Sequence, residues 1–165
     1  MVTENSQDTV KYLHRLTARF CIGACLAGLL IGSASAQSQD PARMEGIRAL
    51  MRDDKLYEAE SAARALVADT SAAKGERSLE TARAIDLLVE THLRLRKGAQ
   101  PEARQLAELA LRIKETLLDA DDLEIAASLL NLGQVHAAMD DYPAARSDYA
   151  RAHEIYPAHE HVPFA

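Results

Sequence analysis

The strongest constraint on the fold is an internal repeat of helical segments. The motif Leu-Glu-x-Ala at residues 79–82 recurs at 123–126, 44 residues later, and the motif Pro-x-Ala-Arg at 101–104 recurs at 143–146, 42 residues later. Around these motifs apolar residues return every three or four positions, which is the period of an α-helix packed on a core. A repeat of this length predicts a solenoid, in which stacked helical hairpins bury one another's faces.

Polar breaks divide the repeat region into helices that pair through short links. An Asp followed by Pro at residues 40–41 is a good helix start, and the polar stretches 69–78 and 119–122 separate the pairs. Gly98 is expected to cap the third helix at its C-terminus. The six expected helices run from Asp40 to the Asp53-Asp54 break, from Leu56 to Leu66, from Ala82 to Leu95, from Pro101 to Leu117, from Leu123 to Met139 and from Pro143 to Ile155.

Composition excludes several function classes. The hydrophobic fraction of 48% and the charged fraction of 27% are those of an ordinary globular chain. Aromatic residues make up only 4% and Trp is missing, which argues against a base-stacking surface. The formal net charge of −6 disfavours nucleic acid, whose phosphates need a basic face. Composition therefore predicts no nucleic-acid partner, and the helical period of the apolar residues predicts an all-α fold.

Residues 1–36 have the order of a secretory signal peptide. Basic residues precede a short apolar run at 20–31, and the small residues Ala34-Ser35-Ala36 follow it. This order predicts cleavage between Ala36 and Gln37 and export of the mature chain to the bacterial periplasm or beyond. The run is too short for a membrane-spanning helix, and a lipoprotein signal at Cys25 is the weaker alternative. The mature chain then has no Cys and no membrane span.

The last hairpin resembles the tetratricopeptide repeat (TPR) family. The family pattern combines a Leu-Gly pair, small residues, aromatic residues and a closing Pro. The residues that fill this pattern are Leu132, Gly133, His136, Ala145, Tyr149, Ala152 and Pro157. His136 departs from it, because it stands in the first aromatic position. Gly133 leaves room for the Tyr149 ring, and residues 127–133 resemble the kinesin-light-chain variety. The resemblance implies about three repeats over 37–157, ended by Pro157, and a C-terminal tail at 158–165.

The resemblance also implies a peptide-binding groove along the first helix of each hairpin. Asn131 corresponds to an Asn with which kinesin-light-chain-like repeats hold a ligand's backbone. Asp86 and Glu90 place negative charge where a carboxylate clamp would need positive charge. The groove positions carried over from the family are Arg83, Asp86, Glu90, Arg94, Ala127, Leu130, Asn131, Gln134 and Ala138. The alternative is that those on the third helix form a solvated face with i,i+3 and i,i+4 pairs.

No residue pattern indicates catalysis, a cofactor or a metal site. His92 and His136 occupy equivalent places in successive repeats, so they are expected to be packed in the core. His153, His159 and His161 form a denser cluster near the C-terminus, but their spacing matches no zinc signature. A metal-binding role for this His-rich tail is the weakest hypothesis.

The sequence therefore predicts a non-enzymatic scaffold or adaptor that binds a protein or peptide partner. The second hypothesis is a structural accessory of an envelope, pilus or secretion complex, in which the ends of the solenoid matter more than its groove. Few residues follow the third hairpin, so a second copy of the chain or a partner protein is expected to cover its outer face.

Overall fold

The computed structural model describes residues 40–160, and the side chains of residues 40–156. The signal peptide, its cleavage site and the side chains of His159 and His161 lie outside the described residues. Within residues 40–160 the fold is all-α, without strands, as predicted. Its helices are α2 (Asp40–Arg52), α3 (Leu56–Lys74), α4 (Leu79–Arg94), α5 (Pro101–Leu117), α6 (Leu123–Ala138) and α7 (Tyr142–Glu160).

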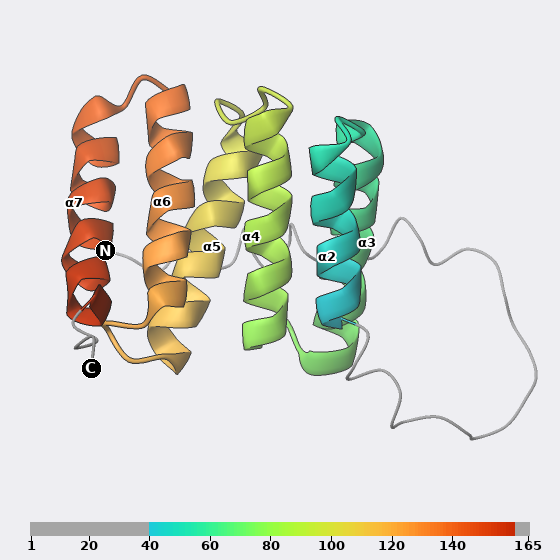
Figure 1. Cartoon of the computed structure of the whole chain (residues 1–165), viewed down its shortest axis with the longest axis horizontal. Coiled ribbons are helices and arrows are strands. Elements are labelled where there is room, and N and C mark those ends of the chain that lie inside the picture. The colour runs from blue at the N-terminus through green and yellow to red at the C-terminus, as the bar shows by residue number, and fades with distance from the viewer. Residues whose placement is uncertain (1–39, 161–165) are drawn as a thin grey trace, which may run out of the picture.

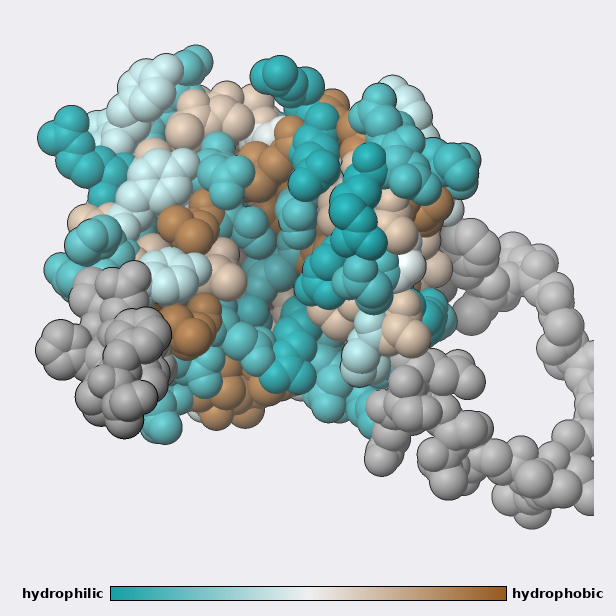
Figure 2. Space-filling view, viewed as in Figure 1, coloured by the Kyte–Doolittle hydropathy of each residue, from teal (hydrophilic) through white to brown (hydrophobic). Residues whose placement is uncertain are grey.

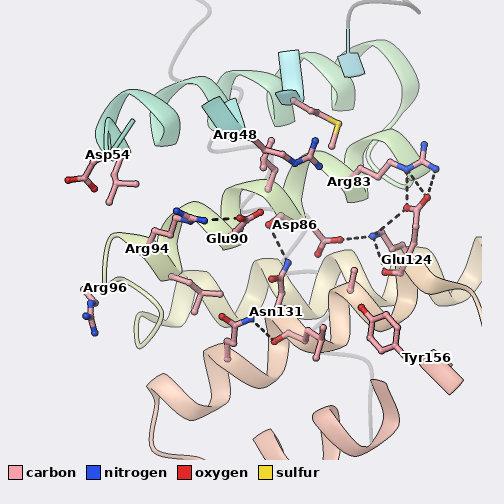
Figure 3. A pocket seen from close by; sticks show the side chains of 18 residues that line it. Arg48, Asp54, Arg83, Asp86, Glu90, Arg94, Arg96, Glu124, Asn131 and Tyr156 are labelled. Carbon is pink, nitrogen blue, oxygen red and sulfur yellow. Dashed lines mark hydrogen bonds and ion pairs between the residues drawn. The ribbon is translucent and has the colours of Figure 1, made fainter. Parts of the chain in front are cut away.

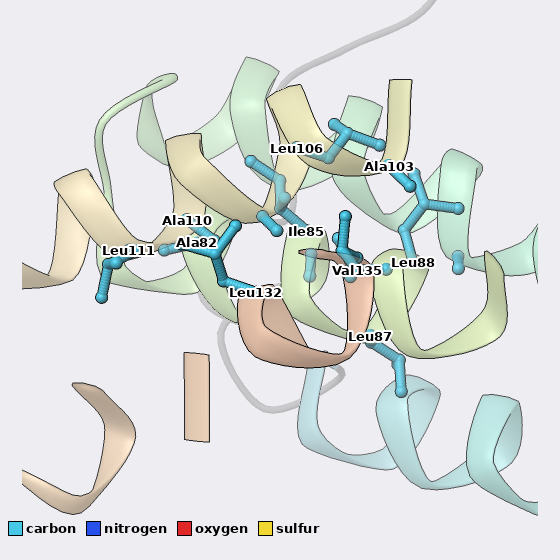
Figure 4. Packing of buried hydrophobic residues seen from close by; sticks show 14 of the residues in the cluster. Ala82, Ile85, Leu87, Leu88, Ala103, Leu106, Ala110, Leu111, Leu132 and Val135 are labelled. Carbon is cyan, nitrogen blue, oxygen red and sulfur yellow. The ribbon is translucent and has the colours of Figure 1, made fainter. Parts of the chain in front are cut away.

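These helices form three antiparallel hairpins that stand side by side in chain order (Figure 1). The first helices α2, α4 and α6 line the face toward the viewer, and α3 and α5 lie behind them. Large apolar side chains from neighbouring hairpins meet in one core, shown in Figure 4, where Ile85 and Leu88 of α4 and Leu106 of α5 are buried. Burial of each such side chain stabilises the fold by about 1.5–3 kcal/mol.

Side-chain caps and a proline begin the later helices. The Ser78 hydroxyl accepts the backbone N–H of Thr81, and the Asp122 carboxylate accepts that of Glu124. Pro101 begins α5, where its missing N–H has no intrahelical partner to lose. The local sequence thus sets where the hairpin links end.

The turns inside the hairpins share one geometry. Asp54, Arg96 and Asp140 all have a left-handed backbone, with φ of 59°, 59° and 62°. They lie 42 and 44 residues apart and follow the first helix of each hairpin. The prediction that Gly98 caps α4 is therefore wrong, because Arg96 takes the left-handed position. Gly98 instead lets the Leu93 side chain pack closely against the backbone, since a Cβ at Gly98 would lie 2.8 Å from Leu93 Cδ2.

Two helices extend beyond their predicted ends. Helix α3 continues to Lys74 through the polar stretch that begins at residue 69. Buried Thr70 permits this, because its hydroxyl donates to the Leu66 carbonyl at 2.8 Å. Helix α7 continues past Pro157 to Glu160, so this proline does not end it. A proline removes one backbone donor and crowds the preceding turn, but only three residues of α7 follow it.

Small residues bring the two helices of the third hairpin together. The Tyr149 ring lies against Gly133, where an added Cβ would be 2.5 Å from Tyr149 Cε1. Ala145 and Ala152 of α7 and Leu132 of α6 are buried. Half-buried His136 pairs through Nδ1 with Asp148 Oδ2 at 2.7 Å. Between residues 40 and 160, no helix is long and apolar enough to cross a membrane.

Candidate interaction groove

The first helices of the three hairpins enclose a groove of about 990 Å³ (Figure 3). Eight of the nine residues predicted from the family resemblance line it: Arg83, Asp86, Glu90, Arg94, Ala127, Leu130, Asn131 and Gln134. Ala138 does not line the groove. It lies at the end of α6 and packs toward the link after α4, because a Cβ added at Gly98 would lie 3.1 Å from the Ala138 Cβ. We call this space the interaction groove.

A buried ion pair forms the floor of the groove. Lys114 of α5 donates from Nζ to Asp86 Oδ2 of α4 at 2.6 Å, and only 3% of the lysine side chain is exposed. The Ser128 hydroxyl of α6 donates to the same carboxylate oxygen at 2.7 Å. Burial raises the pKa of Asp86 above its ordinary value, although Lys114 and Ser128 oppose that shift. Three helices are therefore linked through one carboxylate.

A second ion pair lies beside this floor. Arg83 of α4 holds both carboxylate oxygens of Glu124 on α6, with Nε at 2.9 Å from Oε2 and 3.0 Å from Oε1. Hydrogen bonds from Arg83 lower the pKa of Glu124, against the effect of burial. Lys114 Nζ lies 3.5 Å from Glu124 Oε2, so the two pairs form one network across α4, α5 and α6.

These contacts change the expected charge of the groove. Asp86 does not present free negative charge, because Lys114 and Ser128 hold its carboxylate. Arg83 and Asp86 also bind other helices, so the alternative of a solvated α4 face with local pairs is wrong for both. Glu90 and Arg94 form the local i,i+4 pair expected of such a face, at a distance of 3.8 Å.

Three arginines remain at the edge of the groove, and we call them the basic rim: Arg48, Arg94 and Arg96 (Figure 3). Arg48 and Arg94 make only 3.8 Å contacts with carboxylates of their own helices. Arg96 has no ion pair or hydrogen bond through its side chain among residues 40–156. The opposite wall on α6 carries uncharged Ala127, Leu130, Asn131 and Gln134. Asp54 and Glu90 also line the groove, so the side opposite α6 is charged, with arginines in small excess over carboxylates, and the α6 wall is neutral.

Sequence reasoning missed several lining residues. They are Met44, Arg48, Asp54, Leu56, Leu87, Leu93, Arg96, Lys114, Glu124 and Tyr156. Lys114 was the one with a readable signal, because it continues the apolar stripe of Ala107 and Leu111 at helical spacing. A lysine in such a stripe needs a buried acid, and the helix before it supplies Asp86.

A separate polar cluster lies between the first and second hairpins. Glu60 of α3 contacts Arg64 at 3.2 Å, Lys97 at 2.6 Å and His92 Nε2 at 3.2 Å. Arg64 also pairs with Glu102 of α5 at 2.7 Å. Burial lowers the pKa of His92, which is fully buried as predicted. We call these five residues the first-junction cluster.

Neither polar network is arranged as a metal centre. Within the described residues, no group of three or more His, Cys, Asp and Glu side chains is placed to hold a metal ion. His92 lies among two cations as well as two carboxylates, which is the environment of a packed ionic cluster.

The geometry defines the class of protein: an all-α array of helical hairpins with a groove along its first helices. Residues 96–158 match the model of the tetratricopeptide repeat family. This region is therefore similar to TPR repeats, which are non-catalytic scaffolds that generally mediate protein–protein interaction. Comparison with curated proteins and with solved structures gave no match.

Proposed function

We propose that this protein is a non-enzymatic adaptor that binds an extended, acidic protein segment in the interaction groove. The observation that carries this proposal is the charge arrangement of the groove. Its buried carboxylates are neutralised by Lys114 and Arg83, whereas the basic rim makes only long contacts within its own helices. An acidic segment supplies the charge that this rim lacks.

The neutral wall on α6 supplies polar groups that can hold the backbone of a bound peptide. Asn131 donates from Nδ2 to the Asp86 carbonyl at 3.5 Å, which leaves its side-chain oxygen to accept a ligand N–H. Gln134 lies one turn further along α6 and Leu130 offers an apolar contact. This arrangement supports a groove of the kinesin-light-chain-like variety, which remains part of the proposal.

We place the adaptor in the bacterial periplasm, on the evidence of residues 1–36 alone. The test is expression of the full chain in a bacterium, followed by mass spectrometry of the exported protein. A new N-terminus at or near Gln37 is expected. Exported protein that retains Met1 would contradict the signal-peptide prediction.

Selection from a random peptide display library tests the groove. With exported protein as bait, we expect enrichment of peptides rich in Asp and Glu. The double variants Arg94→Glu/Arg96→Glu and Asn131→Ala/Gln134→Ala should each weaken binding at least about ten-fold. Affinity for the acidic peptides should also fall with added salt, because exposed charges are screened.

The matched control is Arg104→Glu/Arg112→Glu, two half-exposed arginines of α5 that do not line the groove. This control should bind the selected peptides as the unchanged protein does. Peptides that bind the groove variants equally well would overturn the groove proposal. They would favour instead the structural-accessory hypothesis, in which the ends of the array make the contacts.

A further inference from the structure

One strip of each second helix is covered by the hairpin that follows it. On α3 this strip contains Ala63, Val67 and Thr70, and all three are buried. On α5 the equivalent residues, 44 positions later, are Ala107, Leu111 and Lys114, which are also buried. Lys114 reaches the backbone carbonyl of Glu124 on α6 at 3.2 Å. Inside the array, the first helix of the following hairpin therefore covers this strip of each second helix.

Within the described residues, no helix follows α7 to cover the equivalent strip. The residues 42 positions after Ala107, Leu111 and Lys114 are Tyr149, His153 and Tyr156. Tyr149 and Tyr156 are 37% and 39% exposed, and His153 is exposed too. Tyr156 also lines the end of the interaction groove. Tyr142 lies one heptad earlier on the same face of α7 and is 63% exposed. Its equivalent Gln100, before α5, is exposed as well. Figure 2 shows pale, weakly polar groups along the α7 edge of this face.

The residue types on this strip suit an interface between separate chains. Inside the array the strip holds Ala, Val, Leu, Thr and Lys, whereas α7 carries a tyrosine every seven residues. Tyrosine offers a large apolar ring with a polar tip, and it is enriched at protein interfaces. The ring of Tyr149 is already held in place against Gly133, which lowers the entropy cost of an association.

We propose that two copies of this chain pair through α7, antiparallel and around a two-fold axis at Tyr149. The equal spacing of the tyrosines makes the strip complementary to itself. With Tyr149 on the axis, Tyr142 of each copy lies opposite Tyr156 of the other. Arg146 lies between Tyr142 and Tyr149 on the same strip, where it meets the tyrosine rings of the second copy and adds cation–π contacts.

The other end of the array explains why the pairing is not head to tail. Leu87 of α4 packs toward the preceding helix α2 (Figure 4), and the equivalent residue of α2 is Glu45. Glu45 is exposed and pairs with Arg52 at 2.8 Å and Arg48 at 3.8 Å. Placing this face on α7 would bury a set of charges against tyrosine rings. The α2 end is therefore polar, and α7 fits another α7.

Sedimentation velocity over a micromolar concentration range tests the proposal on protein purified after export of the full chain. We expect a concentration-dependent monomer–dimer equilibrium. Tyr142→Glu should raise the dissociation constant at least about ten-fold, because it places a carboxylate against Tyr156 of the second copy. Adding Tyr156→Lys should restore dimerisation, since only an antiparallel pair brings positions 142 and 156 together.

Tyr57→Glu is the matched control, because Tyr57 is 75% exposed on α3, far from α7 in the chain order of the array. It should leave the dimer unchanged, and circular dichroism should show that every variant folds. A monomer at all concentrations would overturn the proposal. A dimer insensitive to Tyr142→Glu, or one that the second substitution does not restore, would overturn it as well.

Discussion

The two junctions between hairpins bury charge in different ways. At the first, between α3 and α4, the first-junction cluster shares its charges, and Glu60 alone contacts Arg64, His92 and Lys97. At the second, between α5 and α6, Lys114 and Asp86 form one close pair supported by the Ser128 hydroxyl. The same helical framework therefore gives Glu60 several ionic partners at one junction and Asp86 a single ionic partner at the other.

The two junctions therefore differ in how strongly their stability depends on one side chain. When a charge has several partners, removing one of them leaves the others in place. When a buried charge has a single ionic partner, removing that partner leaves it uncompensated in a poorly solvated site. The second junction should therefore be the more sensitive to truncation, although fewer charges are involved.

Lys114→Met should give the largest effect, a loss of about 3–5 kcal/mol in the free energy of unfolding. The methionine fills the space but leaves the buried Asp86 carboxylate without an ionic partner. Urea denaturation followed by circular dichroism measures the loss. In the double variant Lys114→Met/Asp86→Asn most of the stability should return, because the buried charge is gone. A loss below about 1 kcal/mol, or no recovery, would refute the single-pair interpretation.

Acid should weaken the first junction before the second. The pKa of His92 is lowered by burial, so the unfolded chain binds a proton more readily than the folded one. Stability should therefore fall as the pH drops below about 6.5, by up to about 1.4 kcal/mol per pH unit for this group. Asp86 has the opposite sign, because its raised pKa makes the folded chain bind the proton more readily.

The variant His92→Phe separates the two contributions. Its unfolding free energy should change less with pH between about 7 and 5.5 than that of the unchanged protein. The reason is that phenylalanine cannot bind the proton that His92 takes up on unfolding. Urea denaturation at a series of pH values provides the comparison. An identical pH dependence in both proteins would show that His92 is not the group that titrates.

Lys97→Met should have the smallest effect, a loss of about 0.5–1 kcal/mol. Lys97 is 27% exposed, and Glu60 keeps Arg64 and His92 when the lysine is removed. Part of the loss comes from its contact with the Tyr57 ring, whose centroid lies 5.7 Å from Nζ. The substitution is the same as at Lys114, so equal losses in the two variants would abolish the contrast between the junctions.

Most of the fold follows from the sequence because its signals are local. Apolar spacing, the Asp and Ser caps and Pro101 place the helices, and the repeat places the hairpins. Helix ends were less predictable, since they depend on what the polar residues meet. Thr70 continues α3 because its hydroxyl finds a carbonyl in the preceding turn, and Arg96 takes a backbone position that glycine usually occupies.

The groove was predictable in outline and its charge was not. Eight of the residues that line it are positions carried over from the family resemblance. Its charge depends on Lys114, which lies on a second helix and pairs with an acid 28 residues earlier. The helical spacing of Lys114 with Ala107 and Leu111 indicates that the lysine is buried, but it does not report which acid the lysine meets. The same limit applies to the first-junction cluster, which joins side chains of α3, α4 and α5 to the link after α4.

The shared left-handed turns have a consequence for how such a chain changes in length. Asp54, Arg96 and Asp140 mark equivalent points, 42 and 44 residues apart. A gene segment cut between two of these points encodes the second helix of one hairpin and the first helix of the next, which together make one repeat. Its tandem duplication would insert a hairpin without reversing the path of the chain, and the groove would gain one wall.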